Sequence, residues 1–134
     1  MAEHPNVQRI RDAYAAFAAG DLAASLKDVA PDGVFHFNGE GPNSGDHQGA
    51  EAIGAALISL FELTGGSQVL DIKSVFADDR HGVVVLHETA SRTDGVKLDI
   101  DEVHVLALDG EGRITDLWDL PADPEVHDKF FDGR

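Results

Sequence analysis

The sequence predicts a single α+β domain, and three observations carry that prediction. Apolar residues recur every three or four positions in three segments of the first half, which is the spacing of amphipathic helices. The second half is rich in β-branched residues between short turn signals, which is typical of strands. An Asp-Pro pair then opens a last helix, and 134 residues leave room for one domain, placed over residues 1–134.

Three helices are predicted before the strand-rich half. The first runs from Pro5 to Gly20 and carries one apolar stripe made of Val7, Ile10, Tyr14 and Phe17. A second, short helix lies between the N-cap Asp21 and Pro31, which cannot continue a helix. The third covers residues 50–64 and stops at two consecutive glycines.

The remaining elements are mostly strands. Residues 34–37 read as a short strand, and residues 39–49 are so rich in glycine and polar groups that we expect a long loop without an element. Longer strands are predicted near residues 69–77, 83–92, 96–108 and 113–120. The terminal helix begins at Asp123-Pro124 and ends with Phe130-Phe131.

Composition excludes several classes of function. The formal net charge of -15, from 25 acidic and 10 basic residues, argues against nucleic acid and against anionic membranes as partners. The chain has no cysteine, so disulfides and thiolate chemistry are excluded. We find no basic segment followed by an apolar run and no apolar stretch of about 18 residues, so we expect a cytoplasmic protein.

Two turns predict how the strands pair. If Asp94-Gly95 forms a two-residue hairpin, then Thr93 pairs with Val96 and His87 lies opposite Glu102. The second turn, over residues 109–112, would pair Leu108 with Arg113. That register sets Glu102 opposite Asp119 and His104 opposite Leu117.

Because side chains alternate along a strand, these registers predict one face with a polar centre. The polar residues are His87, Glu102, His104 and Asp119, and the flanking positions are Val85, Thr89, Leu98, Ile100, Leu106, Leu108 and Leu117. Polar residues surrounded by apolar ones are typical of a cavity wall. The other face carries Arg92, Lys97, Asp99 and Asp101 at one end and a candidate homodimer surface made of Leu86, Val103, Val105, Ala107 and Trp118.

Five segments together resemble a known family. They are residues 14–22, 30–36, 47–49, 104–110 and 118–119, and in this order they are similar to SnoaL-like polyketide cyclases and ketosteroid isomerases of the nuclear transport factor 2 superfamily. The resemblance implies a cone-shaped barrel in which a strongly curved antiparallel sheet wraps around three helices, with a short C-terminal helix. It also implies an apolar pocket that hosts acid–base chemistry on a small molecule.

The resemblance is uneven at the positions that carry chemistry. Ala13 looks like the position at which ketosteroid isomerases have their oxyanion tyrosine, and Phe37 looks like the position of their general-base aspartate. Both departures argue against steroid isomerisation. His104 looks like the position of the second, protonated acid of ketosteroid isomerases, and His87 looks like the position of an aromatic residue that lines their pocket. Asp119 beside His104 is similar to the acid–base pair of SnoaL-like cyclases. Epoxide hydrolases of this fold are less similar, because no arginine is predicted on the inward face.

The leading hypothesis is an acid–base isomerase, cyclase or lyase that acts on a small apolar carbonyl compound without a cofactor. Asp119 would remove a proton next to the carbonyl, His104 would donate a hydrogen bond to the enolate, and Glu102 and His87 would orient them. Substrate contacts are expected from Tyr14, Phe17, Phe35, Phe37, Phe61, Leu106 and Leu117.

Three alternatives remain open. The polar centre could be a buried hydrogen-bond network without a chemical role, or the protein could be a non-catalytic ligand-binding or dimeric assembly module. Two histidines and two carboxylates could also bind a metal, but we expect none because the resemblance implies none. His36 is predicted to point outward, and His4, His81 and His127 lie near ends or turns and receive no role.

Overall fold

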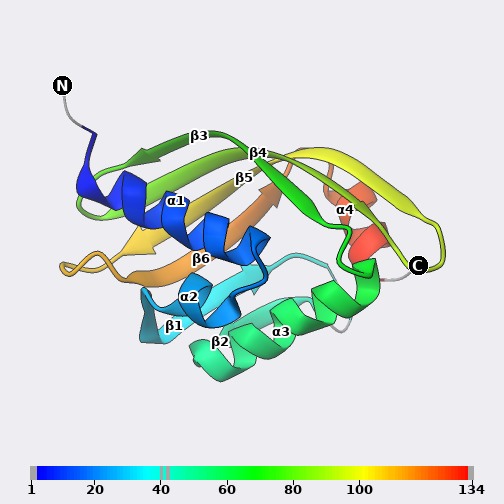
Figure 1. The fold of residues 1–134 in the computed structure, drawn as a ribbon, viewed down its shortest axis with the longest axis horizontal. Coiled ribbons are helices and arrows are strands. Elements are labelled where there is room, and N and C mark those ends of the chain that lie inside the picture. The colour runs from blue at the N-terminus through cyan, green and yellow to red at the C-terminus, as the bar shows by residue number, and fades with distance from the viewer. Residues whose placement is uncertain (1–2, 40, 42, 133–134) are drawn as a thin grey trace.

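The computed structural model describes residues 3–39, 41 and 43–132, and it confirms the α+β class (Figure 1). The helices are α1 (Pro5–Ala18), α2 (Leu22–Leu26), α3 (Gly49–Thr64) and α4 (Pro124–Phe131). The strands are β1 (Val29–Phe37), β2 (Gly45–Gln48), β3 (Val69–Ala77), β4 (His81–Ser91), β5 (Lys97–Leu108) and β6 (Ile114–Pro121). The ends of α3 and α4 agree with the sequence signals: Asp123 accepts a hydrogen bond from the backbone of Val126, and Gly65 adopts a left-handed φ of 59° after α3. Helix α2 is shorter than predicted, because it ends at Leu26 and the residues from Val29, Pro31 included, belong to β1.

The strands form one open sheet in the order β2-β1-β6-β5-β4-β3. Every neighbouring pair is antiparallel, as predicted, except β1 and β6, which run parallel. Strand β2 is also a correction, because it lies inside the segment predicted to be a plain loop. Its residues pair with β1 through the backbone, and no apolar alternation announces such an edge strand. Glu40 and Pro42 of that loop lie outside the described residues.

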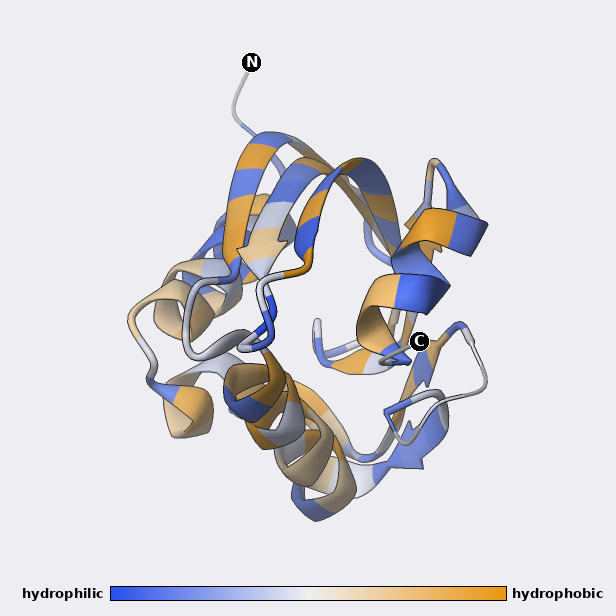
Figure 2. Ribbon diagram, turned by 90° about the vertical axis from the view of Figure 1, so that its right-hand side faces the viewer, coloured by the Kyte–Doolittle hydropathy of each residue, from blue (hydrophilic) through white to orange (hydrophobic). Residues whose placement is uncertain are grey.

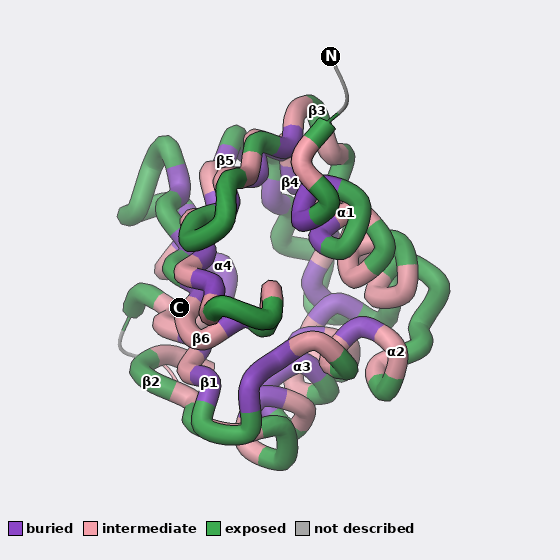
Figure 3. The backbone as a smooth tube through the Cα atoms, turned by 90° about the vertical axis from the view of Figure 1, so that its left-hand side faces the viewer, coloured by how far each residue is buried: buried purple, intermediate pink, exposed green. Residues whose placement is uncertain are grey.

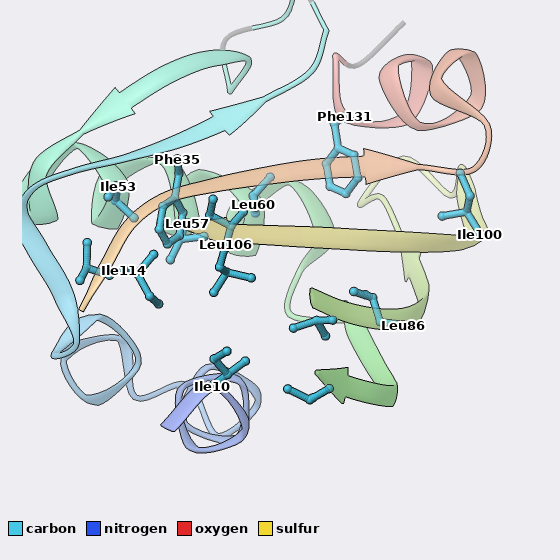
Figure 4. Packing of buried hydrophobic residues seen from close by; sticks show 14 of the residues in the cluster. Ile10, Phe35, Ile53, Leu57, Leu60, Leu86, Ile100, Leu106, Ile114 and Phe131 are labelled. Carbon is cyan, nitrogen blue, oxygen red and sulfur yellow. The ribbon is translucent and has the colours of Figure 1, made fainter. Parts of the chain in front are cut away.

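The helices cover one face of the sheet and enclose the core. Helix α1 packs on β3 and β4, α3 packs on β1, and α4 packs on β5 and β6 (Figure 1). Strands alternate in hydropathy, which Figure 2 shows as stripes. Buried stretches of the backbone line the interior in Figure 3, and Figure 4 shows core side chains such as Ile10, Phe35 and Leu106 converging there.

The β4–β5 hairpin differs from its prediction by one residue. The backbone N–H of Arg92 donates to Val96 at 2.7 Å, so the turn holds three residues and ends in Gly95 with φ of 95°. A slip of one residue turns every side chain of the strand to the other face. His87 therefore pairs with Asp101 and points outward, and the prediction that His87 faces inward is wrong.

The same slip corrects other β4 assignments. Leu86, placed on the outer face by prediction, is 1% exposed and lies inward, and Arg92 is also buried. Glu88 takes an inward position in place of His87, while Val85 and Thr89 turn outward. The inward phase of β5 is confirmed at Leu98, Ile100 and their successors.

The β5–β6 register differs from its prediction by two residues. His104 pairs with Asp119, and Glu102 pairs with Pro121. One residue comes from the turn, because the backbone N–H of Asp109 donates to Arg113 at 2.9 Å and leaves three residues in the turn. The second comes from an irregularity between Ala107 and Leu108, which turn length alone does not reveal. Because a shift of two residues preserves the face, Glu102, His104 and Asp119 remain inward as predicted, although their partners change.

The outer face of the sheet carries a contiguous apolar surface. The register places Phe76 beside Val83, Val83 beside Val105, and Val105 beside Trp118. We define the outer apolar patch as Phe76, Val83, Val85, Val103, Val105, Trp118 and Leu120, of which Phe76, Trp118 and Leu120 are exposed. Among the described residues, no helix is long and apolar enough to cross a membrane.

His36 borders this patch and points outward, as predicted. Its ring stacks on Trp118 with centroids 4.9 Å apart and an interplanar angle of 6°. Its two nitrogens lie 2.8 Å from a carboxylate oxygen of Asp46 and 3.0 Å from one of Asp116. Burial opposes protonation, but these two carboxylates outweigh it and raise the pKa of His36.

The pairing of His36 predicts a pH-dependent contribution to stability. A raised folded-state pKa means that the stabilisation is complete below the unfolded pKa of about 6.5 and disappears as pH rises through the higher folded value. Trp118 is the single tryptophan and stacks on His36, so its fluorescence reports the titration. We expect a midpoint above that of free histidine, lowered by Asp116→Asn and unchanged by the helix-surface control Asp12→Asn. An unshifted midpoint in the wild type contradicts the pairing.

Candidate functional site

A cavity of about 950 Å³, including its mouth, lies between the helices and the inward face of the sheet. Its lining is mostly apolar with a few polar side chains, which is typical of small-molecule sites. Six of the seven predicted substrate contacts line it: Tyr14, Phe17, Phe35, Phe37, Leu106 and Leu117. The seventh, Phe61, does not belong to the described lining; its ring packs on Phe17 with centroids 5.4 Å apart.

Polar side chains gather on one wall of this otherwise apolar cavity. We call them the polar cluster: Tyr14, Gln68, Glu88, Glu102, His104, Asp119 and His127. They come from α1, β4, β5, β6, α4 and the residue before β3, so six parts of the chain meet here. Glu102 is 2% exposed, and the cluster is largely removed from solvent.

His104 links the helical side of the cavity to the sheet. Its Nδ1 lies 2.5 Å from the hydroxyl of Tyr14. Its Nε2 lies 3.3 Å from Oε2 of Glu102 and 3.4 Å from Oδ1 of Asp119. The imidazole therefore stands between a phenol and two carboxylates.

His127 approaches the same two carboxylates from α4. Its Nε2 lies 3.1 Å from Oε1 of Glu102 and 3.2 Å from Oδ2 of Asp119. The buried guanidinium of Arg92 fixes this helix, because it donates to the backbone carbonyls of Lys129 and Phe130 at 3.3 and 3.2 Å. Each carboxylate of the pair thus faces two imidazoles.

The surroundings shift the protonation of all four groups. Burial alone would lower the pKa of both histidines, but the acidic partners outweigh it, so the pKa of His104 is well above its usual value and that of His127 rises to about 10. Burial would raise the pKa of the two carboxyls, but the imidazoles outweigh it and lower the pKa of Asp119 and of Glu102. At neutral pH, two imidazolium ions therefore balance two carboxylates.

Glu88 is the exception among the acids. Burial, together with the hydrogen bond and charge of Glu102, raises the pKa of Glu88 to about 9, although the side-chain amide of Gln68 also donates to it. A neutral Glu88 can donate its proton to the ionised Glu102. Burial also raises the pKa of Tyr14, so its hydroxyl stays protonated at neutral pH.

The structure brings together three of the four predicted catalytic residues, Glu102, His104 and Asp119. His87 is on the outer face, where its nitrogens lie 2.5 and 2.6 Å from Asp99 and Asp101, and it takes no part in the cavity. The one-residue hairpin error is the cause.

Sequence reasoning missed Gln68, Glu88 and His127. A signal existed for the last two. His127, Phe130 and Phe131 follow a three-and-four spacing that places the histidine on the buried face of α4. Glu88 shares the inward phase of Leu86 and Ala90, so a carboxylate interrupts an apolar row.

Tyr14 was predicted only as a substrate contact, but the structure places its hydroxyl in the polar cluster. The resemblance suggested that a tyrosine of α1 is replaced by Ala13, and Ala13 does line the cavity. The adjacent Tyr14 nevertheless extends its hydroxyl to His104. A phenol is thus present at the polar wall.

Within the described ranges 3–39, 41 and 43–132, two sets of three residues bring potential metal-ligand atoms within 4.8 Å of one another. They are Glu88, Glu102 and His127, and Glu102, His104 and Asp119. Both sets are buried and share Glu102.

Comparison with known proteins identifies a family whose model matches most of this chain. The model of a family described as SnoaL-like domain matches residues 10–117. Uncharacterised proteins of Mycobacterium tuberculosis and Mycobacterium bovis are 27% identical over 131 residues, which cover 98% of this chain and 99% of theirs.

Solved structures share the fold over nearly their whole length. Bal32a, from a soil-derived mobile gene cassette, is 29% identical with a TM-score of 0.87, covering 94% of this chain and 95% of that one. A protein of unknown function with a cystatin-like fold from Xanthomonas campestris is 23% identical with a TM-score of 0.86, covering 98% and 100%. TerC, co-crystallised with polyporic acid, is 20% identical with a TM-score of 0.84, covering 96% and 98%.

The charge balance of the polar cluster predicts the effect of removing one member. His127→Gln leaves Glu102 and Asp119 short of a positive partner in an apolar setting, and we expect a loss of about 3–5 kcal/mol in the free energy of unfolding. The exposed His81→Gln serves as control and should stay within about 0.5 kcal/mol. Denaturant unfolding measures both, and equal stabilities of the two variants contradict the buried balance.

Proposed function

Because this chain belongs to the SnoaL-like domain family, we propose that its cavity binds a small, largely apolar carbonyl compound and isomerises or cyclises it by acid–base chemistry of its own side chains. The observation that carries this proposal is the polar cluster on one wall of an apolar cavity. An apolar body would pack on Phe17, Phe35 and Leu117, and its carbonyl would meet the polar wall. TerC, which shares the fold, was co-crystallised with polyporic acid, a small-molecule precedent for the fold.

Asp119 is the proposed proton acceptor. It lines the cavity, and its Oδ1 has no hydrogen-bond partner among the described residues. That oxygen is available to take a proton from the carbon next to a bound carbonyl. His127 lies between Glu102 and Asp119 and holds the carboxylate of Asp119 in place, so His127 takes the orienting role that the sequence suggested for His87.

Tyr14 is the proposed hydrogen-bond donor to the developing enolate. A protonated His104 donates from Nδ1 to the oxygen of Tyr14, which leaves the phenolic O–H free to point at a ligand. The adjacent positive charge favours a negative ligand oxygen at this position. This arrangement compensates for the weakness of Asp119 as a base, since its pKa is low.

A second candidate function rests on that same low pKa. Two imidazolium partners stabilise the ionised Asp119, which weakens it as a proton acceptor. A module that binds the carbonyl compound without converting it uses the same cavity and the same donors.

Hydrogen exchange separates the two candidates. In D2O, the protein incubated with a panel of cyclic and aromatic ketones should speed deuterium incorporation next to the carbonyl, as read by NMR. Asp119→Asn and Tyr14→Phe should each lower that rate by about 100-fold or more. Asp116→Asn, on the outer face of the same strand, is the control and should leave it unchanged. Ligand-induced shifts without exchange favour the binding module, and undiminished exchange in Asp119→Asn removes the proposed base.

We also propose that the protein forms a homodimer through the outer apolar patch. Seven neighbouring apolar side chains on the outer sheet face, several of them exposed, exceed the scattered hydrophobes of an ordinary surface. A second copy offers the same apolar patch, so a two-fold arrangement buries both at once. Leu86, which the sequence assigned to this surface, takes no part because it lies inward.

Light scattering tests the dimer. At micromolar concentration we expect twice the chain mass for the wild type and a monomer for Val105→Glu, because a charge in the centre of the patch opposes its burial. Ile58→Glu is the matched control, since Ile58 is 49% exposed on α3 and lies away from the patch. A monomeric wild type contradicts the proposal.

A further inference from the structure

We propose that the polar cluster also forms a binding site for one divalent transition-metal ion such as Zn²⁺, held by Glu102, His104 and Asp119. All three line the cavity, so the remaining coordination positions of the ion would face a bound ligand. The inference uses the same residues as the proposed function but does not depend on any reaction.

The donor set suits such an ion. One imidazole nitrogen and two carboxylate oxygens are ligands that zinc and related metals accept, and three protein ligands with a free position are typical of catalytic sites. These three atoms lie within 4.8 Å of one another. Glu102 and His104 sit two residues apart on β5, and Asp119 is the cross-strand partner of His104 on β6.

The spacing is the first argument for an ion. Nε2 of His104 lies 3.3 Å from Glu102 and 3.4 Å from Asp119. A charge-assisted hydrogen bond between such atoms is shorter, about 2.7–2.9 Å. Two ligand atoms bound at about 2.0–2.2 Å to one zinc with tetrahedral angles lie roughly 3.4 Å apart. The observed separations therefore match shared ligands better than direct hydrogen bonds.

An unsatisfied oxygen is the second argument. Oδ1 of Asp119, the oxygen that lies 3.4 Å from Nε2 of His104, is buried and has no hydrogen-bond partner within the part of the chain that the structure describes. The side chain of Glu102, whose Oε2 faces the same nitrogen, is only 1% exposed. Leaving a buried polar atom without a partner is unfavourable, and a cation bound by these three residues would satisfy the oxygen of Asp119.

The orientation of His104 is the third argument. The hydroxyl of Tyr14 occupies Nδ1 at 2.5 Å, which leaves Nε2 as the ring nitrogen that faces the carboxylates. Histidine ligands of metals usually bond through one nitrogen while a second group holds the other. Tyr14 would be that second group.

Zinc titration by calorimetry tests the site directly. Protein treated with a chelator and then freed of it should bind one equivalent of Zn²⁺ per chain. His104→Asn and Glu102→Gln should each weaken the affinity by about 100-fold or more, whereas Tyr14→Phe, which keeps all three ligands, should weaken it by about 10-fold. Co²⁺ should give visible absorption bands with the wild type that disappear with His104→Asn.

The matched control is His87→Asn. His87 also lies between two aspartates, Asp99 and Asp101, but on the exposed outer face, so its replacement should leave Zn²⁺ affinity unchanged. Circular dichroism checks that each variant is folded, and Tyr14→Phe keeps the test informative if His104→Asn is not. Absence of saturable Zn²⁺ binding by the wild type, or an equal loss in His87→Asn, overturns the inference.

The same samples separate this inference from the proposed function. Ketone exchange by the chelator-treated protein without Zn²⁺ binding supports the acid–base proposal and overturns the metal site. Stoichiometric Zn²⁺ binding lost with His104→Asn supports the metal site whether or not any ketone exchanges.

Discussion

The structure depends on a balance of charge inside an apolar cavity. Glu102 and Asp119 are ionised carboxylates almost out of reach of water, and each faces the imidazoles of His104 and His127 at 3.1–3.4 Å. The two buried carboxylates without the imidazoles, or the imidazoles without the carboxylates, would destabilise the fold, because an unpaired buried charge is strongly destabilising. The helix that brings His127 and the two strands that bring the carboxylates must therefore assemble together, which couples the fold to the site.

That balance also limits what the site can do. A carboxylate held by two imidazolium ions is a weak base, while the phenol of Tyr14 beside a protonated His104 is a strong hydrogen-bond donor. The wall is better suited to stabilising negative charge on a ligand than to removing a proton unaided. A metal ion at Glu102, His104 and Asp119 would change this, since it would take over the role of the positive partner.

Membership of the SnoaL-like domain family explains the scaffold more than the chemistry. The relatives share a curved sheet around helices, and a single fold hosts many reactions. The polar cluster comes from six parts of the chain, and three of its residues, Gln68, Glu88 and His127, received no role from the sequence. The outer apolar patch is a separate property of the same sheet, because alternation gives each strand one face toward the cavity and one toward the outside.

The amino-acid sequence by itself determined the four helices and the four long strands of the second half, since helical spacing, β-branched runs and turn residues are local signals. It also determined the inward phase of Glu102, His104 and Asp119, because alternation along one strand needs no partner. Only the tertiary structure decided the pairing. The β4–β5 turn holds three residues instead of two, and this difference places Glu88 in the cavity and His87 on the outer face. Arg92 holds α4 against the sheet, which brings His127 to the carboxylates. The parallel pairing of β1 with β6 could not be predicted from the sequence either. Strand register and helix docking are set by contacts between segments far apart in the chain, and short-range sequence patterns carry no information about such contacts.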